Sequence, residues 1–280
     1  MLSVIIPANN EAALIGACLT ALLASTGAGT GVDTGAGAVQ IIVAANGCTD
    51  PTCAIALGFV ARAEARGWML QVLDLPQGHK PGALNAADAL AVHPARAYLD
   101  ADVTVSPDLL AQTMTALNRP DATFASGRVH ITGQSLISRA YAAIWARVPF
   151  MRHGVPGCGF FAVDGAGRAR WAAFPPIISD DTFVRLQFSP AERVLVPARY
   201  DWPIAEGFSN LVRVRRRQDA GVAEVAALYP AILGNDGTPA LGTTGLLKLA
   251  LSNPAAFLIY AAVALNVRLT PGGTDWSRGR

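Results

Sequence analysis

Short apolar runs alternate with amphipathic segments along the first hundred residues of the chain. The apolar runs have the length of buried strands, and they cover residues 2–7, 39–44, 69–73 and 97–99. The segments between them predict helices over residues 11–25, 52–66 and 80–91. Strands and helices that alternate in this way indicate an α/β fold built on a mostly parallel, doubly wound sheet.

The second half of the chain has a less regular pattern. It predicts strands at 124–131 and 157–163 and helices at 136–148 and 180–187. Residues 26–38 are rich in glycine and are expected to form a surface loop. The almost uncharged run AAFLIYAAVALNV at 255–267 is shorter than the ~20 residues that span a bilayer. It predicts a helix that packs on the protein or lies in a membrane interface.

Composition narrows the functional classes. Hydrophobic residues make up 52% of the chain and charged residues 15%, which excludes a disordered or nucleic-acid-coating protein. The net charge of +2 gives no general attraction to nucleic acid. Four cysteines without a CxxC pair, and no basic region before the first strand, predict a cytoplasmic protein. Attachment to the inner face of the cytoplasmic membrane stays open, and the sequence gives no indication of oligomeric state.

Polar clusters follow the first, second and fourth of these strands, and ligands of doubly wound sheets bind at the carboxyl ends of strands. Asp100-Ala101-Asp102 follows the fourth strand directly. Two carboxylates one residue apart can bind a hard divalent cation such as Mg²⁺ or Mn²⁺. Taken alone, the same residues could form a polar turn or cap a helix.

Four segments extend this picture because they occur together and in order. They are SVIIPANNE (3–11), IIVAANGCTD (41–50), GHKPGALNAA (78–87) and YLDADV (98–103), and their order and spacing resemble those of family 2 glycosyltransferases. Farther along, GCGFFAV (157–163) resembles the acceptor-side turn of that family, SDDTFVRL (179–186) its acidic motif, and RVRRRQDAG (213–221) a variant of its Gln-x-x-Arg-Trp region.

The resemblance covers residues 1–221 and implies a GT-A fold with an irregular acceptor-side half. It implies a nucleotide-sugar-binding half at 1–103 and an acceptor-binding half at 104–221, followed by a helical region at 222–280 that is a candidate for membrane association. It also implies a donor site, in which Glu11 reaches ribose, Asn46 lies near the base and Lys80 meets the diphosphate. The full set of implied donor contacts is Pro7, Ala8, Asn10, Glu11, Asn46, Lys80, Asp100, Ala101 and Arg217.

The resemblance assigns the remaining chemistry to aspartates. Asp102 would ligate Mn²⁺ or Mg²⁺, and Asp100 would contact ribose or a metal-bound water. Asp181 would be the catalytic base and Asp180 would orient the acceptor. Glu11 and the Asp180-Asp181 pair could instead cap helix starts, and Lys80 could be a solvated lysine. The arginines of 213–217 could face anionic lipid rather than a diphosphate.

The function implied is metal-dependent, inverting transfer of one sugar from a UDP- or GDP-sugar to a glycan or lipid-linked acceptor, in cell-envelope or exopolysaccharide synthesis. The chain departs from the family pattern at Asn9, where an aromatic is usual, and at Ala45, where many relatives have an aspartate that contacts uracil. Val214 and Gln218 replace the Gln and Trp of the late motif, which favours single-sugar transfer over processive synthesis. The alternatives are a nucleotidyltransferase of similar fold and a non-catalytic scaffold that binds nucleotide sugars or membranes.

Overall fold

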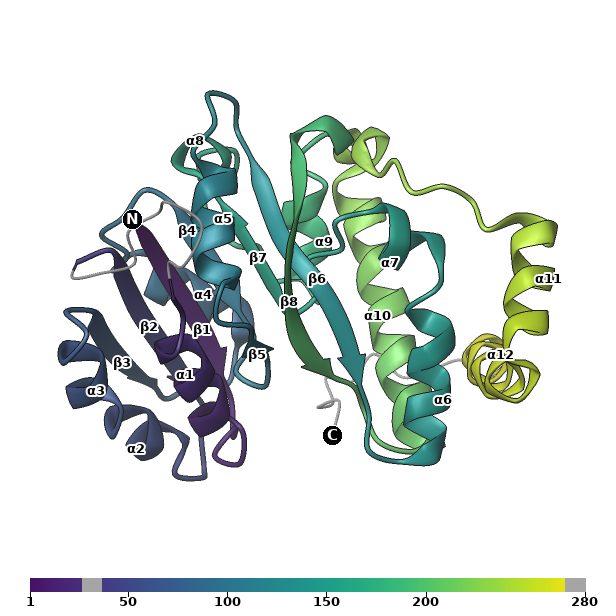
Figure 1. The fold of residues 1–280 in the computed structure, drawn as a ribbon, viewed down its shortest axis with the longest axis horizontal. Helices are drawn as coiled ribbons and strands as arrows, with labels where there is room; N and C mark the ends of the chain where they lie inside the picture. The colour runs from purple at the N-terminus through teal and green to yellow at the C-terminus, as the bar shows by residue number, and fades with distance from the viewer. Residues whose placement is uncertain (27–36, 270–280) are drawn as a thin grey trace.

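The computed structural model describes residues 1–26 and 37–269, so most of the loop expected at 26–38 lies outside the described residues. An eight-stranded sheet in the order β3-β2-β1-β4-β7-β6-β8-β5 runs through the molecule (Figure 1). Its first four strands are β1 (Leu2–Ala8), β2 (Val39–Asn46), β3 (Met69–Leu75) and β4 (Arg96–Leu99). All four are parallel, and they confirm the strands predicted in the first hundred residues.

The other four strands make the sheet mixed. β7 (Phe160–Val163) is antiparallel to β4 and to β6 (Phe124–Thr132), whereas β8 (Arg193–Pro203) pairs parallel to β6. The short β5 (Thr104–Val105) is antiparallel to β8 at the edge. Parallel pairings therefore predominate, as predicted.

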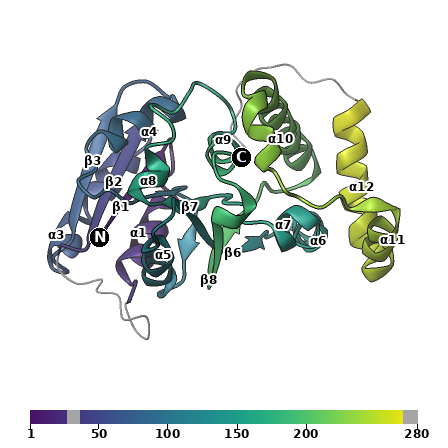
Figure 2. The same cartoon turned by 90° about the horizontal axis from the view of Figure 1, so that it is seen from above.

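Helices cover both faces of the sheet because its strands alternate apolar residues toward each face. In β1, Val4 and Ile6 belong to one core and Ile5 to the other. The first core also contains residues of α1 (Ile15–Leu23), α2 (Thr52–Leu57), α3 (Val60–Glu64) and α5 (Leu109–Leu117). The second contains residues of α4 (Lys80–Asp88), α9 (Asp180–Arg185) and α10 (Phe208–Leu228), which lie on the opposite side in Figure 2.

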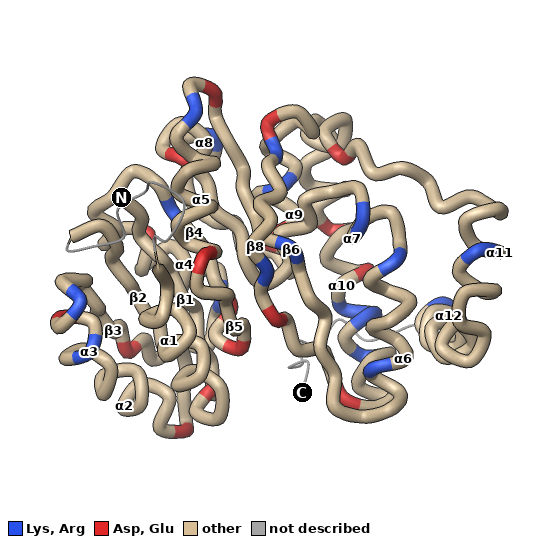
Figure 3. The backbone as a smooth tube through the Cα atoms, in the orientation of Figure 1, with Lys and Arg blue, Asp and Glu red and all other residues tan. Residues whose placement is uncertain are grey.

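The remaining helices are placed around the second half of the sheet. They are α6 (Leu136–Trp145), α7 (Pro149–His153), α8 (Gly165–Arg168), α11 (Gly242–Ser252), α12 (Pro254–Leu269) and two 3₁₀ turns, η1 (Pro190–Glu192) and η2 (Pro230–Asn235). α12 packs on α6 and α10 through Val263, Tyr141 and Leu211. No helix in the described ranges has both the length and the apolarity needed to cross a bilayer. Figure 3 shows basic but no acidic residues on α11 and α12.

The helices expected at 80–91, 136–148 and 180–187 end two or three residues early, and two others differ more from their predicted extents. The helix expected at 52–66 is interrupted between α2 and α3, where the amide of Gly58 donates to both Ala54 O and Ile55 O in a tight turn. The helix expected at 11–25 begins only at Ile15. The amides of Leu14 and Ile15 both donate to Glu11 O, so residues 11–14 form a turn that leads into the helix, and the amide of Glu11 donates to Thr52 Oγ1 at the start of α2, at 2.7 Å.

Candidate active site

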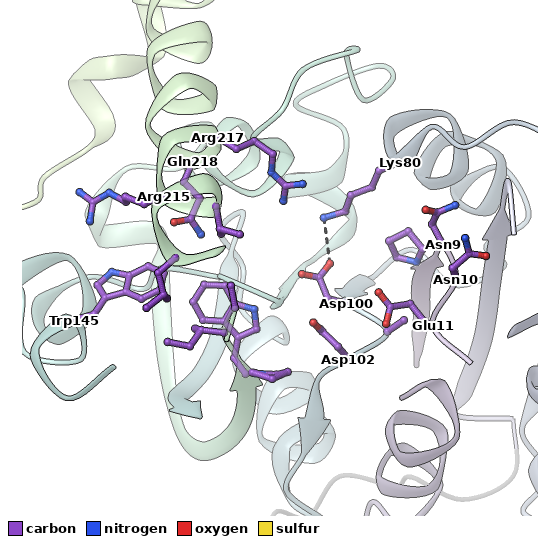
Figure 4. A pocket seen from close by; sticks show the side chains of 18 of the residues that line it. Asn9, Asn10, Glu11, Lys80, Asp100, Asp102, Trp145, Arg215, Arg217 and Gln218 are labelled. Carbon is purple, nitrogen blue, oxygen red and sulfur yellow. Dashed lines mark ion pairs between the residues drawn. The ribbon is translucent and has the colours of Figure 1, made fainter. Parts of the chain in front are cut away.

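A pocket of about 370 Å³ opens at the carboxyl ends of the strands, where the strand order reverses between β1 and β4 (Figure 4). One side of the pocket comes from the loops after β1, β2 and β4 and from the start of α4. The other side comes from α6, the end of β8 and α10. The pocket therefore lies between the two halves expected from the sequence.

The structure brings most of the predicted donor contacts to this pocket. Its lining includes Pro7, Asn10, Glu11, Asn46, Lys80, Asp100, Ala101, Asp102 and, from the opposite side, Arg217. Ala8 is the exception, because it is buried within β1 and does not line the pocket. Its carbonyl instead accepts a hydrogen bond from Asn46 Nδ2, at 2.9 Å.

The asparagines of the first two loops hold those loops together. Asn10 has a positive φ of 54°, and its Oδ1 accepts from the amides of Thr49, at 2.6 Å, and Asp50, at 3.2 Å. Asn46 is buried and cross-links β1 to β2. Asn9 also lines the pocket, and its Nδ2 donates to the carbonyls of Asn46 and Gly47. These side chains therefore fix the shape of the pocket wall beside the carboxylates.

Lys80 is positioned by a close approach of two loops. A Cβ on Gly47, which has a φ of 55°, would lie 2.5 Å from Gly78 N, so this contact requires glycine. The loop then leads into α4, where Lys80 Nζ lies 3.1 Å from both Asp100 Oδ1 and Asp180 Oδ1. Burial opposes the charge on Lys80, but Asp100, Asp180 and Asp181 together raise its pKa above the ordinary value. Lys80 is therefore a cation that links two pairs of aspartates.

The side chains of Asp100, Asp102 and Glu11 point toward the same part of the pocket (Figure 4). Their charges, added to the effect of burial, raise the pKa of the nearby Cys18 thiol. Carboxylate oxygens are the ligands that a hard divalent cation prefers. Among the residues that the structure describes, no three carboxylate, histidine or cysteine side chains are grouped so that they could hold a metal by themselves.

A smaller cavity of about 20 Å³ adjoins the pocket and shares Pro7, Lys80 and Asp100 with it. Asp180 and Asp181 line this cavity. Asp180 is buried and paired with Lys80, whereas Asp181 is half-buried and accepts from the amide of Thr182, at 2.7 Å. Burial and the charge of Asp180 raise the pKa of Asp181 to about 6, against the opposing effect of Lys80. Asp181 is therefore an acceptor that can gain or lose a proton near neutral pH.

The far side of the pocket is aromatic, a feature that the sequence patterns did not reveal. Tyr141 and Trp145 come from α6 and Trp202 from β8. The ring centroids of Trp145 and Trp202 lie 5.3 Å apart, and those of Tyr141 and Trp145 lie 5.6 Å apart. The turn before β7 places Trp202, since a Cβ on Gly159 would lie 2.8 Å from its Cδ1 atom. The available signal in the sequence was the alternation of Val196, Ala198, Tyr200 and Trp202 with Pro197, Arg199 and Asp201. In the structure, Val196, Ala198 and Tyr200 are buried and their neighbours are not.

The four arginines of the basic cluster separate into two groups. Only Arg215 and Arg217 line the pocket. Arg215 Nε pairs with Asp219 Oδ1 at 2.7 Å, and its Nη1 donates to the hydroxyls of Tyr141 and Tyr260 at 3.4 Å. Arg217 instead points toward Lys80 and Asp100 (Figure 4). Of the pair, Arg217 is therefore the one directed at the carboxylate side of the pocket.

Solved structures with this architecture include nucleotide-sugar enzymes. The mannosyltransferase PcManGT from Pyrobaculum calidifontis, in complex with GDP-Man and Mn²⁺, matches 97% of this chain and 76% of its own, with a TM-score of 0.60 and 18% identity. Glucosyl-3-phosphoglycerate synthase from Mycobacterium tuberculosis, with Mn²⁺ and UDP, matches 81% and 79% at a TM-score of 0.52 and 18% identity. TarS 1–349 from S. aureus, with UDP-GlcNAc, matches 95% and 81% at 0.51 and 14%. These likenesses confirm the predicted GT-A fold.

A search of curated proteins gave no significant match. The family model described as glycosyl transferase family 2, in contrast, matches residues 3–158, which is more than half of the chain. That segment contains the loops after β1, β2 and β4 and the start of α4. It therefore includes every carboxylate and the lysine on the near side of the pocket. Because the match extends over more than half of its length, the chain belongs to glycosyl transferase family 2.

Proposed function

We propose that the protein is a metal-dependent, inverting glycosyltransferase that moves one sugar from a UDP- or GDP-sugar to a glycan or lipid-linked acceptor. The observation that carries the proposal is the position of Lys80 between Asp100 and Asp180, at 3.1 Å from each. It joins a carboxylate site suited to a cation and diphosphate to a cavity that contains a second carboxylate pair. A donor bound on one side would thus present its sugar to a base on the other.

In this proposal the near side of the pocket binds the donor. Glu11 reaches the ribose, and Lys80 and Arg217 contact the diphosphate, where their positive charges match its oxygens. Asp100 and Asp102 would hold Mn²⁺ or Mg²⁺. That cation, when bound, would offset the negative charge that develops on the departing diphosphate. Residues 1–103 would therefore supply most donor contacts.

The transfer step needs a base that can reach the acceptor. A hydroxyl oxygen of the acceptor attacks the anomeric carbon from the face opposite the diphosphate, and the bond from that carbon to the diphosphate oxygen breaks. Asp181 accepts the hydroxyl proton, and Asp180 holds Lys80 and the acceptor in place. Attack from the opposite face inverts the configuration at the anomeric carbon.

The aromatic side of the pocket would bind the acceptor. Indole rings offer flat apolar faces, which suit the apolar face of a sugar ring or a lipid-linked group. Trp145 and Trp202 lie in residues 104–221, the half expected to bind the acceptor. An acceptor stacked there would have its hydroxyl directed toward the aspartates. Cell-envelope or exopolysaccharide synthesis is the setting in which such acceptors occur.

The base of the donor nucleotide stays open between uracil and guanine. The similar structures were solved with GDP-Man, with UDP-GlcNAc and with UDP, so the shared fold accommodates both bases. Asn9 stands where relatives usually have an aromatic residue that stacks on the base, and Ala45 stands where many have an aspartate that contacts uracil. This chain must therefore recognise its base in another way.

A donor panel tests the proposal. The protein is mixed with UDP- and GDP-sugars in the presence of Mn²⁺, and free nucleoside diphosphate is measured over time. Slow release from one donor is expected, because water replaces the missing acceptor. Pyrophosphate release from a nucleoside triphosphate would instead identify a nucleotidyltransferase, and binding of a donor with no turnover, even with added acceptor lipids and glycans, would identify a scaffold.

A further inference from the structure

The last described helix, α12, is apolar on its outer side as well as its inner side. Its inner side packs through Ala256 and Val263 against α6 and α10. Its outer side has Leu258, Leu265 and Leu269, which are spaced so that they form one stripe along the helix. A helix that is apolar all round is normally covered on both sides. We therefore expect the outer stripe of α12 to contact a binding partner.

The preceding helix, α11, extends this surface. Leu249 packs between α6 and α12 with Ile144 and Ala256, whereas Leu247 and Leu251 point outward. We call these two residues and the stripe of α12 the outer leucine face: Leu247, Leu251, Leu258, Leu265 and Leu269. Each of the five is between 56% and 71% exposed. Five exposed leucines on two touching helices are more than the scattered apolar residues of an ordinary surface.

The two helices have an arrangement that suits a flat partner. In Figure 1, α11 and α12 form one end of the molecule, with α11 running up the page and α12 along the line of sight. In Figure 2, α12 runs up the page at the same end. Both helices therefore run across the same end of the protein, and a surface placed against that end could touch both. With 16 residues, α12 is also too short to span a bilayer and suits a position in its interface.

The charged side chains of α11 and α12 are both basic. Residues 237–269 contain no Asp or Glu, and Lys248 and Arg268 are exposed there. Arg147, just after the end of α6, is also exposed, and its Nη1 donates to Ser252 Oγ at the end of α11, at 2.8 Å. A second copy of the chain in a two-fold contact would set these cations against each other. Anionic lipid headgroups would instead neutralise them while the leucines enter the acyl region.

We propose that the outer leucine face binds the surface of an anionic membrane. α12 also connects this face to the pocket, because Tyr260 stacks on Tyr141 with 5.1 Å between ring centroids, and Tyr141 lines the aromatic side. A membrane at α12 would thus lie next to the acceptor side. Resting on the proposed function, this favours the lipid-linked acceptor over the free glycan.

Vesicle flotation tests the membrane contact. The wild-type protein should float with phosphatidylcholine vesicles that contain phosphatidylglycerol, and binding should fall when phosphatidylglycerol is left out or salt is raised. The double variant Leu258→Ser/Leu265→Ser should bind these vesicles at least about tenfold more weakly, because each leucine loses its burial in lipid. The matched control, Leu57→Ser/Leu90→Ser, removes two exposed leucines from the other end of the protein and should bind like wild type.

Donor binding separates this inference from the proposed function. All variants should keep metal-dependent nucleotide-sugar affinity, which also shows that they fold. The inference is overturned if wild-type protein does not float, or if the Leu258/Leu265 variant floats as well as the control. It is also overturned if sedimentation shows a dimer that this variant dissociates while vesicle binding is absent. In each of these cases, donor turnover would leave the transferase proposal intact.

Discussion

Asp180 and Asp181 are neighbours in the chain but have different surroundings. Asp180 is buried and paired with Lys80, so its charge is compensated and its side chain is held in place. Asp181 is half-buried, and its pKa is raised to about 6. A base must be able to gain a proton at working pH, which suits Asp181 better than its neighbour.

Exchange of each aspartate for asparagine tests this division. Asp181→Asn keeps the size of the side chain but removes its ability to take a proton, so transfer should slow by about 10²–10⁴-fold. Nucleotide-sugar affinity should change little, because Asp181 is not a donor contact in this proposal. Asp180→Asn should affect both rate and donor affinity, since Lys80 loses a partner. Normal transfer by Asp181→Asn would show that the base lies elsewhere. If Asp180→Asn were inactive in the same assay, the base would be Asp180.

The pH profile gives an independent check on the same residue. Because Asp181 must be deprotonated to act, kcat/KM should rise as the pH passes about 6 and then level off. Stability should show the opposite sign. A carboxyl whose pKa is raised by folding stabilises the protein when protonated, and this contribution is lost as the pH rises through about 6. Asp181→Asn should therefore have a higher Tm than wild type at pH 8, and the difference should shrink toward pH 4.

At this scale the sequence predicted the position of most site residues but not their contacts. Motif order brought Glu11, Lys80, Asp100 and Asp102 into one pocket, because each follows or begins an element at the same sheet edge. The pairing of Lys80 with Asp180 could not be predicted, since the two residues are a hundred positions apart. They come together only when the strands between them take their places in the sheet. Ala8 was expected at the pocket but is buried in its strand.

At the scale of elements, the turn Gly157–Gly159 links the two sides of the pocket. The amide of Asp100 donates to the carbonyl of Gly159, at 2.9 Å, and the α-carbon of the same glycine packs against Trp202. Gly159 has a φ of 72°, and a Cβ there would also lie 2.9 Å from Val103. A side chain at this position would push the β4–β5 turn and the aromatic side apart.

Gly159→Ala should therefore impair both folding and acceptor use. Gly207 offers a matched control, because it has a φ of 80° but nothing within 4 Å of its would-be Cβ. Gly207 has an extended backbone with a ψ of 163°, so Gly207→Ala should cost only the strain of a non-glycine residue in that region, about 1–3 kcal/mol. Gly159→Ala should lower the Tm more than Gly207→Ala does, and it should raise the KM for the acceptor. Trp202→Ala should have the same two effects. Equal stability and equal acceptor KM in Gly159→Ala and Gly207→Ala would contradict the proposed role of the turn.

Elements of the first hundred residues were predictable because their strands are short continuous apolar runs with helices between them. β8 and α10 were not predicted, although both contribute to the pocket. α10 contains a run of arginines and few buried residues, so its helical period is weak in the sequence. Its place is set by contacts with α6, α9 and α12, which join distant segments.

At the scale of the whole molecule, two surfaces line one pocket and a third is connected to it. The loops after the parallel strands supply carboxylates and a lysine, the second half of the sheet supplies an aromatic side, and α12 joins that side to the outer leucine face. The family match covers residues 3–158, which include all of the first surface. The aromatic side and the leucine face depend on packing among α6, α10 and α12, which sequence periodicity does not encode.

Donor binding through a cation held at Asp100 and Asp102 is the step on which the proposed function depends. Its most direct measurement is a calorimetric titration with the donor that the panel identifies, in Mn²⁺ and in excess chelator, for wild type and Asp102→Asn. Wild type should bind tightly only with Mn²⁺, and the variant should lose most of that gain while it stays folded, because its side chain is of the same size. Equal wild-type affinity in chelator and in Mn²⁺, or unchanged metal-dependent binding by Asp102→Asn, would contradict the account.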